Sequence, residues 1–126
     1  MSKWFFLSIT TILLVTIVLS SCDAYGKTPL TEEQALNILV SKIKKDKLYD
    51  SWTTLSCFSF RTEKKTKNYI DIGIHEKHGG KCPGDPNTFP IVDRFRVNRF
   101  SGKVQWYDTE MELYPYKAVL KWRKTK

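Results

Sequence analysis

The chain has 126 residues, of which 21 are Lys or Arg and 13 are Asp or Glu, so its formal net charge at pH 7 is +8. This length suits one compact domain, and the sequence contains no long Gly/Ser tract, repeat or low-complexity block, which excludes a repeat protein or a string of linked modules. The basic excess indicates anionic surroundings or anionic partners.

The first residues have the pattern of a secretory signal. Lys3 supplies one positive charge, and the stretch from Trp4 to Leu19 is uncharged and mostly apolar. A basic start, an apolar core and small residues before a break are typical of a signal peptide. The apolar stretch is shorter than the ~20 residues of a transmembrane helix. An uncleaved transmembrane anchor is the alternative.

A lone cysteine follows the apolar stretch, and Leu19-Ser20-Ser21-Cys22 resembles the bacterial lipobox. The resemblance implies cleavage before Cys22, a thioether-linked diacylglycerol on its sulfur and an acyl chain on its freed amine. It thus implies a lipoprotein signal peptide at 1–21, a lipidated cysteine with a short tether at 22–30, and an extracytoplasmic domain held at the cell membrane. Asp23 resembles the inner-membrane retention signal of enteric bacteria. An ordinary signal peptide with a leftover cysteine is the alternative.

Acylation of Cys22 leaves Cys57 and Cys82 as a pair in an oxidising compartment, where a disulfide is expected. A zinc site is the competing interpretation, since four ligand-capable side chains lie close together in the sequence, namely His75, His78, Cys82 and Asp85. Zinc would leave Cys57 unpaired, and a calcium site at 85–88 lacks an EF-hand-like ligand series. We therefore predict the disulfide, and neither a metal nor a cofactor.

A helix is predicted at 32–47. Thr31 and Gln34 have the spacing of a capping box, and Glu32 and Glu33 occupy the first turn, where the helix dipole favours acidic side chains. Apolar residues then recur at helical spacing and give the helix one apolar face. Lysines crowd its last turns, namely Lys42, Lys44, Lys45 and Lys47.

Segments of alternating apolar and polar residues after the helix predict two β-hairpins. The first has strands at 55–61 and 68–75 around a turn at 63–67, and the second has strands at 91–99 and 103–107. The expected inward-facing residues are Ile70, Ile72, Ile74, Phe95, Val97, Val104 and Trp106. The sequence does not settle which face Phe58 and Phe60 share. The apolar tail at 112–122 is expected to dock as a short helix or strand.

The predicted fold is therefore a single α+β domain at 31–126, with an N-terminal amphipathic helix packed on a four-stranded antiparallel sheet. Two segments resemble PepSY-type domains: Thr31-x-Glu33-Gln34-Ala35-Leu36-x-Ile38, and the hairpin from Phe95 to Val104 around Ser101-Gly102. That resemblance implies a small secreted or envelope-bound module that restrains proteases or contacts other envelope partners.

The segment from His75 to Pro90 is the least ordinary part of the sequence, because a loop of this length in a small domain is usually functional or mobile. Its prolines and the expected disulfide would preorganise it for binding. Arg94 and Arg96 alternate on the strand that follows, where both can contact a partner. The predicted binding residues are His78, Lys81, Asp85, Asn87, Phe89, Arg94 and Arg96.

No catalytic pattern accompanies these residues. The sequence has no nucleophile elbow, no paired carboxylates in a catalytic setting and no phosphate-binding glycine loop. We predict a lipid-anchored, non-enzymatic binding module whose partner is an envelope or secreted protein, including a hydrolase that it restrains. The alternative is a binder of anionic wall or lipid components through its basic face. Nucleic acid is not expected as a partner, because an exported domain meets anionic lipid and wall polymers first.

Overall fold

The computed structural model describes residues 28–126, and the predicted signal peptide, Cys22 and Asp23 lie outside the described residues. The elements in chain order are α1 (Glu32–Asp46), the 3-10 turn η1 (Leu55–Cys57), β1 (Phe58–Lys65), β2 (Tyr69–Glu76), β3 (Ile91–Asn98), β4 (Val104–Tyr107), β5 (Leu113–Pro115) and α2 (Lys117–Lys124). Within residues 28–126, no helix combines the length and apolar character needed to span a membrane.

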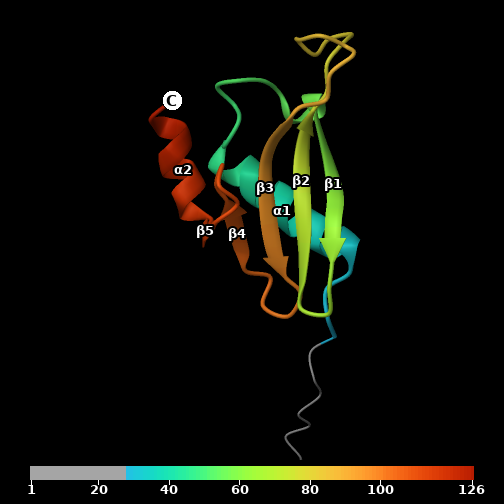
Figure 1. Cartoon of the computed structure of the whole chain (residues 1–126), viewed down its shortest axis with the longest axis vertical. Helices are drawn as coiled ribbons and strands as arrows, with labels where there is room; N and C mark the ends of the chain where they lie inside the picture. The colour runs from blue at the N-terminus through green and yellow to red at the C-terminus, as the bar shows by residue number, and fades with distance from the viewer. Residues whose placement is uncertain (1–27) are drawn as a thin grey trace, which may run out of the picture.

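The five strands form one antiparallel sheet in the order β1-β2-β3-β4-β5. Figure 1 shows α1 crossing one face of this sheet and α2 beside its β4–β5 edge. The α+β prediction is confirmed, but the prediction of four strands is wrong. The fifth strand arises because the Asp108 carboxylate accepts hydrogen bonds from the Glu110 and Glu112 backbone N–H groups, at 2.9 Å each, and reverses the chain onto β4.

The first predicted strand is displaced in the structure. Residues Leu55–Cys57 form a 3-10 turn, and β1 instead continues through the charged residues up to Lys65. A shift of register between Thr62 and Lys64 inserts an extra residue into β1. Such a bulge keeps the backbone paired while the exposed side chains lose their alternation.

The helix begins as predicted. The Gln34 N–H donates to Thr31 Oγ1 at 3.2 Å and the Thr31 N–H donates to Gln34 Oε1 at 3.0 Å, which completes the capping box. The helix ends at Asp46, one residue earlier than predicted, because Lys47 adopts a left-handed conformation (φ 51°) as the C-cap.

The core lies between α1 and the sheet. All predicted inward-facing residues are buried there: Ile70, Ile72, Ile74, Phe95, Val97, Val104 and Trp106. Phe58 is buried in this core and Phe60 packs against it, so both lie on the isoleucine face. Alternation along the strands was therefore sufficient to predict which side chains face inward.

The C-terminal segment docks as both a strand and a helix. The buried Asp93 carboxylate on β3 accepts hydrogen bonds from the Tyr49 hydroxyl at 2.6 Å, from Trp106 Nε1 at 3.0 Å and from Arg123 Nη2 at 2.7 Å. Arg123 belongs to α2, and the side chain of Val119 on the same helix is completely buried. A buried carboxylate with three donors is stably accommodated, and here it joins α2 and the segment after α1 to the sheet.

Candidate functional site

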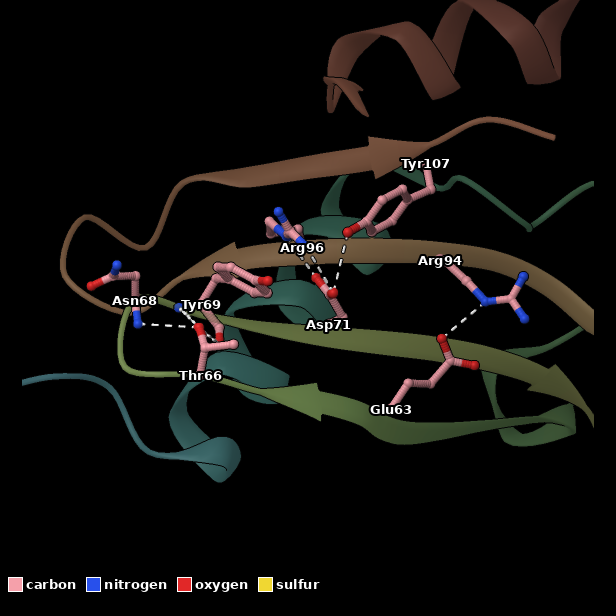
Figure 2. Close-up of polar contacts among 8 residues, drawn as sticks. All are labelled: Glu63, Thr66, Asn68, Tyr69, Asp71, Arg94, Arg96 and Tyr107. Atoms are coloured by element: carbon pink, nitrogen blue, oxygen red, sulfur yellow. Dashed lines mark hydrogen bonds and ion pairs between the residues drawn. The ribbon is translucent and has the colours of Figure 1, made fainter. Parts of the chain in front are cut away.

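The side of the sheet that α1 does not cover carries a polar cluster. Strand register places Asp71 on β2 directly opposite Arg96 on β3, while Arg94 lies opposite Tyr107 on β4. Figure 2 shows Tyr69 and Tyr107 on either side of Arg96, with Asp71 beside it. We call this side the open face.

Arg96 is held by Asp71 in a two-pronged ion pair. Arg96 Nε and Nη2 donate to the two carboxylate oxygens of Asp71 at 2.8 and 2.9 Å, and Asp71 is only 8% exposed. The Tyr107 hydroxyl donates to the same carboxylate at 3.1 Å. The Tyr69 ring lies 3.5 Å from the guanidinium carbon, a cation–π contact. These contacts fix the guanidinium in place.

The two titrating neighbours of Asp71 keep their ordinary protonation. The hydrogen bond from Arg96 to Asp71 raises the pKa of Arg96, so its charge is permanent. Burial, followed by the negative charge of Asp71, raises the pKa of Tyr107, so its hydroxyl stays protonated and continues to donate. Arg96 therefore keeps its charge and Tyr107 its proton at neutral pH, so both continue to donate to Asp71.

A short turn positions the Tyr69 ring. Thr66 Oγ1 accepts hydrogen bonds from the N–H groups of Asn68 at 3.2 Å and Tyr69 at 3.1 Å (Figure 2). The same hydroxyl lies 3.2 Å from the Tyr69 carbonyl. Thr66 thus closes the β1–β2 turn and fixes the start of β2 beneath Arg96.

Arg94 also has an acidic partner within the protein. Its Nε donates to Glu63 Oε2 at 2.9 Å, and the Glu63 side chain covers Gly73, where any Cβ would overlap its carboxylate. Both arginines that the sequence nominates for partner contact therefore have carboxylate partners inside the protein. Their role in binding a partner stays a prediction.

The loop between β2 and β3, residues 77–90, is tied down at several points. The predicted disulfide joins Cys82 to Cys57 at the start of β1, with their Cα atoms 5.4 Å apart. The Lys77 N–H donates to the Cys57 carbonyl at 2.7 Å, and the Glu76 N–H donates to the Pro90 carbonyl at 2.9 Å. Gly79 and Cys82 exchange two backbone hydrogen bonds of 3.0 Å. We call this segment the β2–β3 loop.

His78 lies inside the β2–β3 loop rather than on its surface. Its Nδ1 lies 2.9 Å from the Asp85 carbonyl and 2.8 Å from Thr88 Oγ1, while its Nε2 lies 3.3 Å from Glu76 Oε2. Gly84 packs against the imidazole so closely that a Cβ would overlap the ring. His78 therefore organises the loop from within.

The other predicted loop residues lie at the surface. The Asp85 carboxylate accepts hydrogen bonds from the backbone and side-chain N–H groups of Asn87, at 2.9 and 3.2 Å. Lys81, Asp85, Asn87 and Phe89 are exposed, and Phe89 is 54% accessible. Of the predicted binding residues in the loop, His78 is therefore internal, whereas the other four are exposed and accessible to a partner.

The zinc alternative loses a ligand, because the sulfur of Cys82 is bonded to Cys57. Within residues 28–126, no three side chains of His, Cys, Asp or Glu converge as a metal site. His75 instead lies at the end of β2, with Nδ1 3.4 Å from the Phe89 carbonyl.

Two surface features were missed by reasoning from the sequence. Beside the β2–β3 loop, a depression of about 210 Å³ has the exposed side chains of Ile91, Met111 and Trp122 in its lining, next to charged side chains that include Arg94 and Asp108, and we call it the mixed depression. A larger groove between α1 and the β4–β5 edge is lined by lysines. Both bring together residues that are far apart in the sequence, so no local pattern marks them.

Comparisons of the chain with protein-family models, curated proteins and solved structures find no match. The resemblances to the lipobox and to PepSY-type domains therefore rest on the residues quoted for them.

Proposed function

We propose that this protein is a lipid-anchored bacterial envelope lipoprotein whose domain binds an envelope or secreted protein and does not catalyse a reaction. The observation that carries the proposal is the β2–β3 loop, which is rigidly tied and exposes Phe89. Such preorganisation lowers the entropy lost on binding. Restraint of a hydrolase is the form of binding that the PepSY resemblance favours. Asp23 favours the inner membrane.

The loop lies at the end of the domain farthest from the proposed anchor. Leu30, just before α1, is fixed to the β3–β4 turn by two hydrogen bonds. The Leu30 N–H donates to the Arg99 carbonyl at 2.7 Å, and Arg99 Nε donates to the Leu30 carbonyl at 2.9 Å. Figure 1 shows the β2–β3 loop at the opposite end of the sheet. Eight residues of β2 separate the two ends by about 25 Å at ~3.3 Å per residue.

The proposed contact surface combines the loop with the mixed depression. Lys81, Asn87 and Phe89 supply polar contacts and one large aromatic side chain. Ile91 follows Phe89 by two residues and lines the depression, so the two features adjoin. Exposed apolar side chains beside a rigid polar loop match the composition of protein–protein contact surfaces.

A site-specific photo-cross-linker tests this surface in the cells that make the protein. We expect a cross-linker at Phe89 to capture one defined extracytoplasmic protein, identified by mass spectrometry. The matched control is Phe100, an exposed phenylalanine in the β3–β4 turn at the other end of the sheet. Equal capture from both positions, or none from Phe89, would contradict the proposal.

The disulfide provides a second test. The Cys57→Ser/Cys82→Ser variant opens a loop with a sequence separation of 25, which corresponds to a loss of about 3.5 kcal/mol in the free energy of unfolding. Urea unfolding measures this loss, and capture from Phe89 should fall in parallel at a temperature where the variant is folded. Unchanged stability together with unchanged capture would remove preorganisation from the mechanism.

A further inference from the structure

The lysine-lined groove has a composition that differs from the rest of the surface. Its volume is about 730 Å³, and its floor is formed largely by Ile38, Val104 and Pro115. Four lysines from three separate segments meet around it, namely Lys42 and Lys45 on α1, Lys103 before β4 and Lys117 at the start of α2. We call it the lysine groove.

None of these four lysines forms an ion pair within residues 28–126. No Asp or Glu lines the groove. In the part of the chain that the structure describes, Lys65 is the one lysine within ion-pair distance of a carboxylate, at 3.4 Å from Glu32. Lys42 instead lies 4.8 Å from the centre of the Tyr116 ring. An apolar floor beneath four unpaired ammonium groups is complementary to a molecule with an anionic head and an apolar body.

The position of the groove indicates which such molecule reaches it. Gly102 adjoins Lys103 in the groove, and a Cβ on it would lie 3.4 Å from Ile38 and 3.9 Å from Leu30. Leu30 is where the chain enters α1, so the part of the groove at Gly102 and Lys103 lies beside the point from which the proposed tether leads to the bilayer. An anionic phospholipid in that bilayer supplies both the phosphate and the apolar chains.

We propose that the lysine groove binds an anionic phospholipid of the membrane to which the protein is anchored. The inference rests on the anchoring proposed above and adds a second, electrostatic attachment that orients the domain. Lipid bound at the groove directs the β2–β3 loop away from the membrane. Lipid chains on a single residue before a short tether leave the domain free to reorient, whereas a basic site near the tether holds one face of the domain against the membrane.

Lysine labelling tests the proposal on the full protein reconstituted into vesicles. The vesicles contain phosphatidylcholine alone or mixed with phosphatidylglycerol, and mass spectrometry follows acetylation of each lysine by a water-soluble reagent. We expect phosphatidylglycerol to slow labelling of the four groove lysines by on the order of tenfold. Labelling of Lys77 and Lys124 should be unchanged. Equal slowing at all six lysines, or none at the groove, would overturn the proposal.

Two further arms separate the possible outcomes. Soluble glycerol phosphate should protect the groove far less than the vesicles do; equal protection would indicate a simple anion site and overturn the lipid assignment. The Lys103→Ser/Lys117→Ser variant should lose the protection of Lys42 and Lys45, whereas Lys77→Ser/Lys124→Ser, with the same change of charge, should keep it. The reverse pattern would contradict the proposal.

Flotation distinguishes failure of the groove from failure of the anchor. Co-flotation with vesicles of phosphatidylcholine alone reports the acyl anchor, since the groove contributes nothing there. If the protein floats with neutral vesicles but its groove lysines are not protected, the anchor is supported and the groove proposal is wrong. If the protein floats only with vesicles that contain phosphatidylglycerol, the groove proposal is supported and the proposed anchor is wrong.

Discussion

The open face and the lysine groove both carry basic side chains, yet they differ in whether those side chains have carboxylate partners. On the open face, Arg96 is paired with Asp71 and Arg94 with Glu63. In the groove, the four lysines have no carboxylate partner among residues 28–126. The planar guanidinium suits fixed, two-pronged pairing, whereas the ammonium on its flexible stem stays hydrated and available. The net charge of +8 therefore does not show where a partner meets free positive charge.

Among changes to charged side chains, the largest effect on stability should come from breaking the Asp71–Arg96 pair on the open face. Asp71→Ala leaves Arg96 and the Tyr107 hydroxyl without their acceptor, and we expect the free energy of unfolding to fall by about 2–3 kcal/mol. Urea unfolding measures the loss. Asp71→Ala/Arg96→Met should recover part of it, because no unpaired charge remains. A change below about 0.5 kcal/mol in Asp71→Ala would show that this pair is no more important than an ordinary surface pair.

Alkaline pH should weaken the domain through its tyrosines. Burial is the main cause that raises the pKa values of Tyr49, Tyr107 and Tyr116. Their stabilising contribution is complete below the unfolded pKa of about 10 and is lost as pH rises towards the folded values. As pH rises, each tyrosine that is protonated only in the folded state lowers the free energy of unfolding by about 1.4 kcal/mol per pH unit. Tyr107→Phe should make this decline shallower; an unchanged slope would contradict the shift at Tyr107.

The outer pair of the open face should matter less. Glu63→Gln removes the charge that faces Arg94 but keeps the length of the side chain, and both partners are about one-third exposed. We expect the free energy of unfolding to fall by about 0.5 kcal/mol, and less in high salt. A loss of stability as large as that of Asp71→Ala would contradict this expectation, because the exposed Arg94–Glu63 pair would then stabilise the fold as much as the Arg96–Asp71 pair.

The smallest effect on stability is expected in the groove. Lys103→Ser/Lys117→Ser removes exposed side chains without an ion pair, so the unfolding free energy should change by less than about 0.5 kcal/mol. Chemical unfolding of the variant, alongside Lys77→Ser/Lys124→Ser, measures this. A marked loss in the groove variant alone would mean that these lysines support the fold, and the contrast with the open face would disappear.

Local patterns predicted the features that depend on neighbouring residues. The capping box at Thr31 and the inward isoleucines of β2 follow from spacing alone. The tail at 112–122 was expected to dock as a helix or a strand, and the choice stayed open because the three residues of β5 are too few to show alternation. The pairing of Asp71 with Arg96 depends on the register between β2 and β3, and no single strand reveals that register.

The candidate sites were predicted less completely for the same physical reason. The sequence identified the β2–β3 loop and its disulfide, because prolines, glycines and an even pair of cysteines are visible locally. It placed His78 with the contact residues, although packing against Gly84 turns the ring inward. Lys103 and Lys117 join Lys42 only after the sheet and α2 pack against α1, so the groove has no signature in the sequence.

Membrane attachment at Cys22 underlies both the proposed function and the lipid site, and intact-mass spectrometry of the protein isolated from its own cells tests it directly. We predict a membrane-bound chain that begins at Cys22, carries a diacylglyceryl group and an amide-linked acyl chain, and lacks the two thiol hydrogens of Cys57 and Cys82. A full-length, unlipidated chain with reduced thiols in the cytosol would contradict the account.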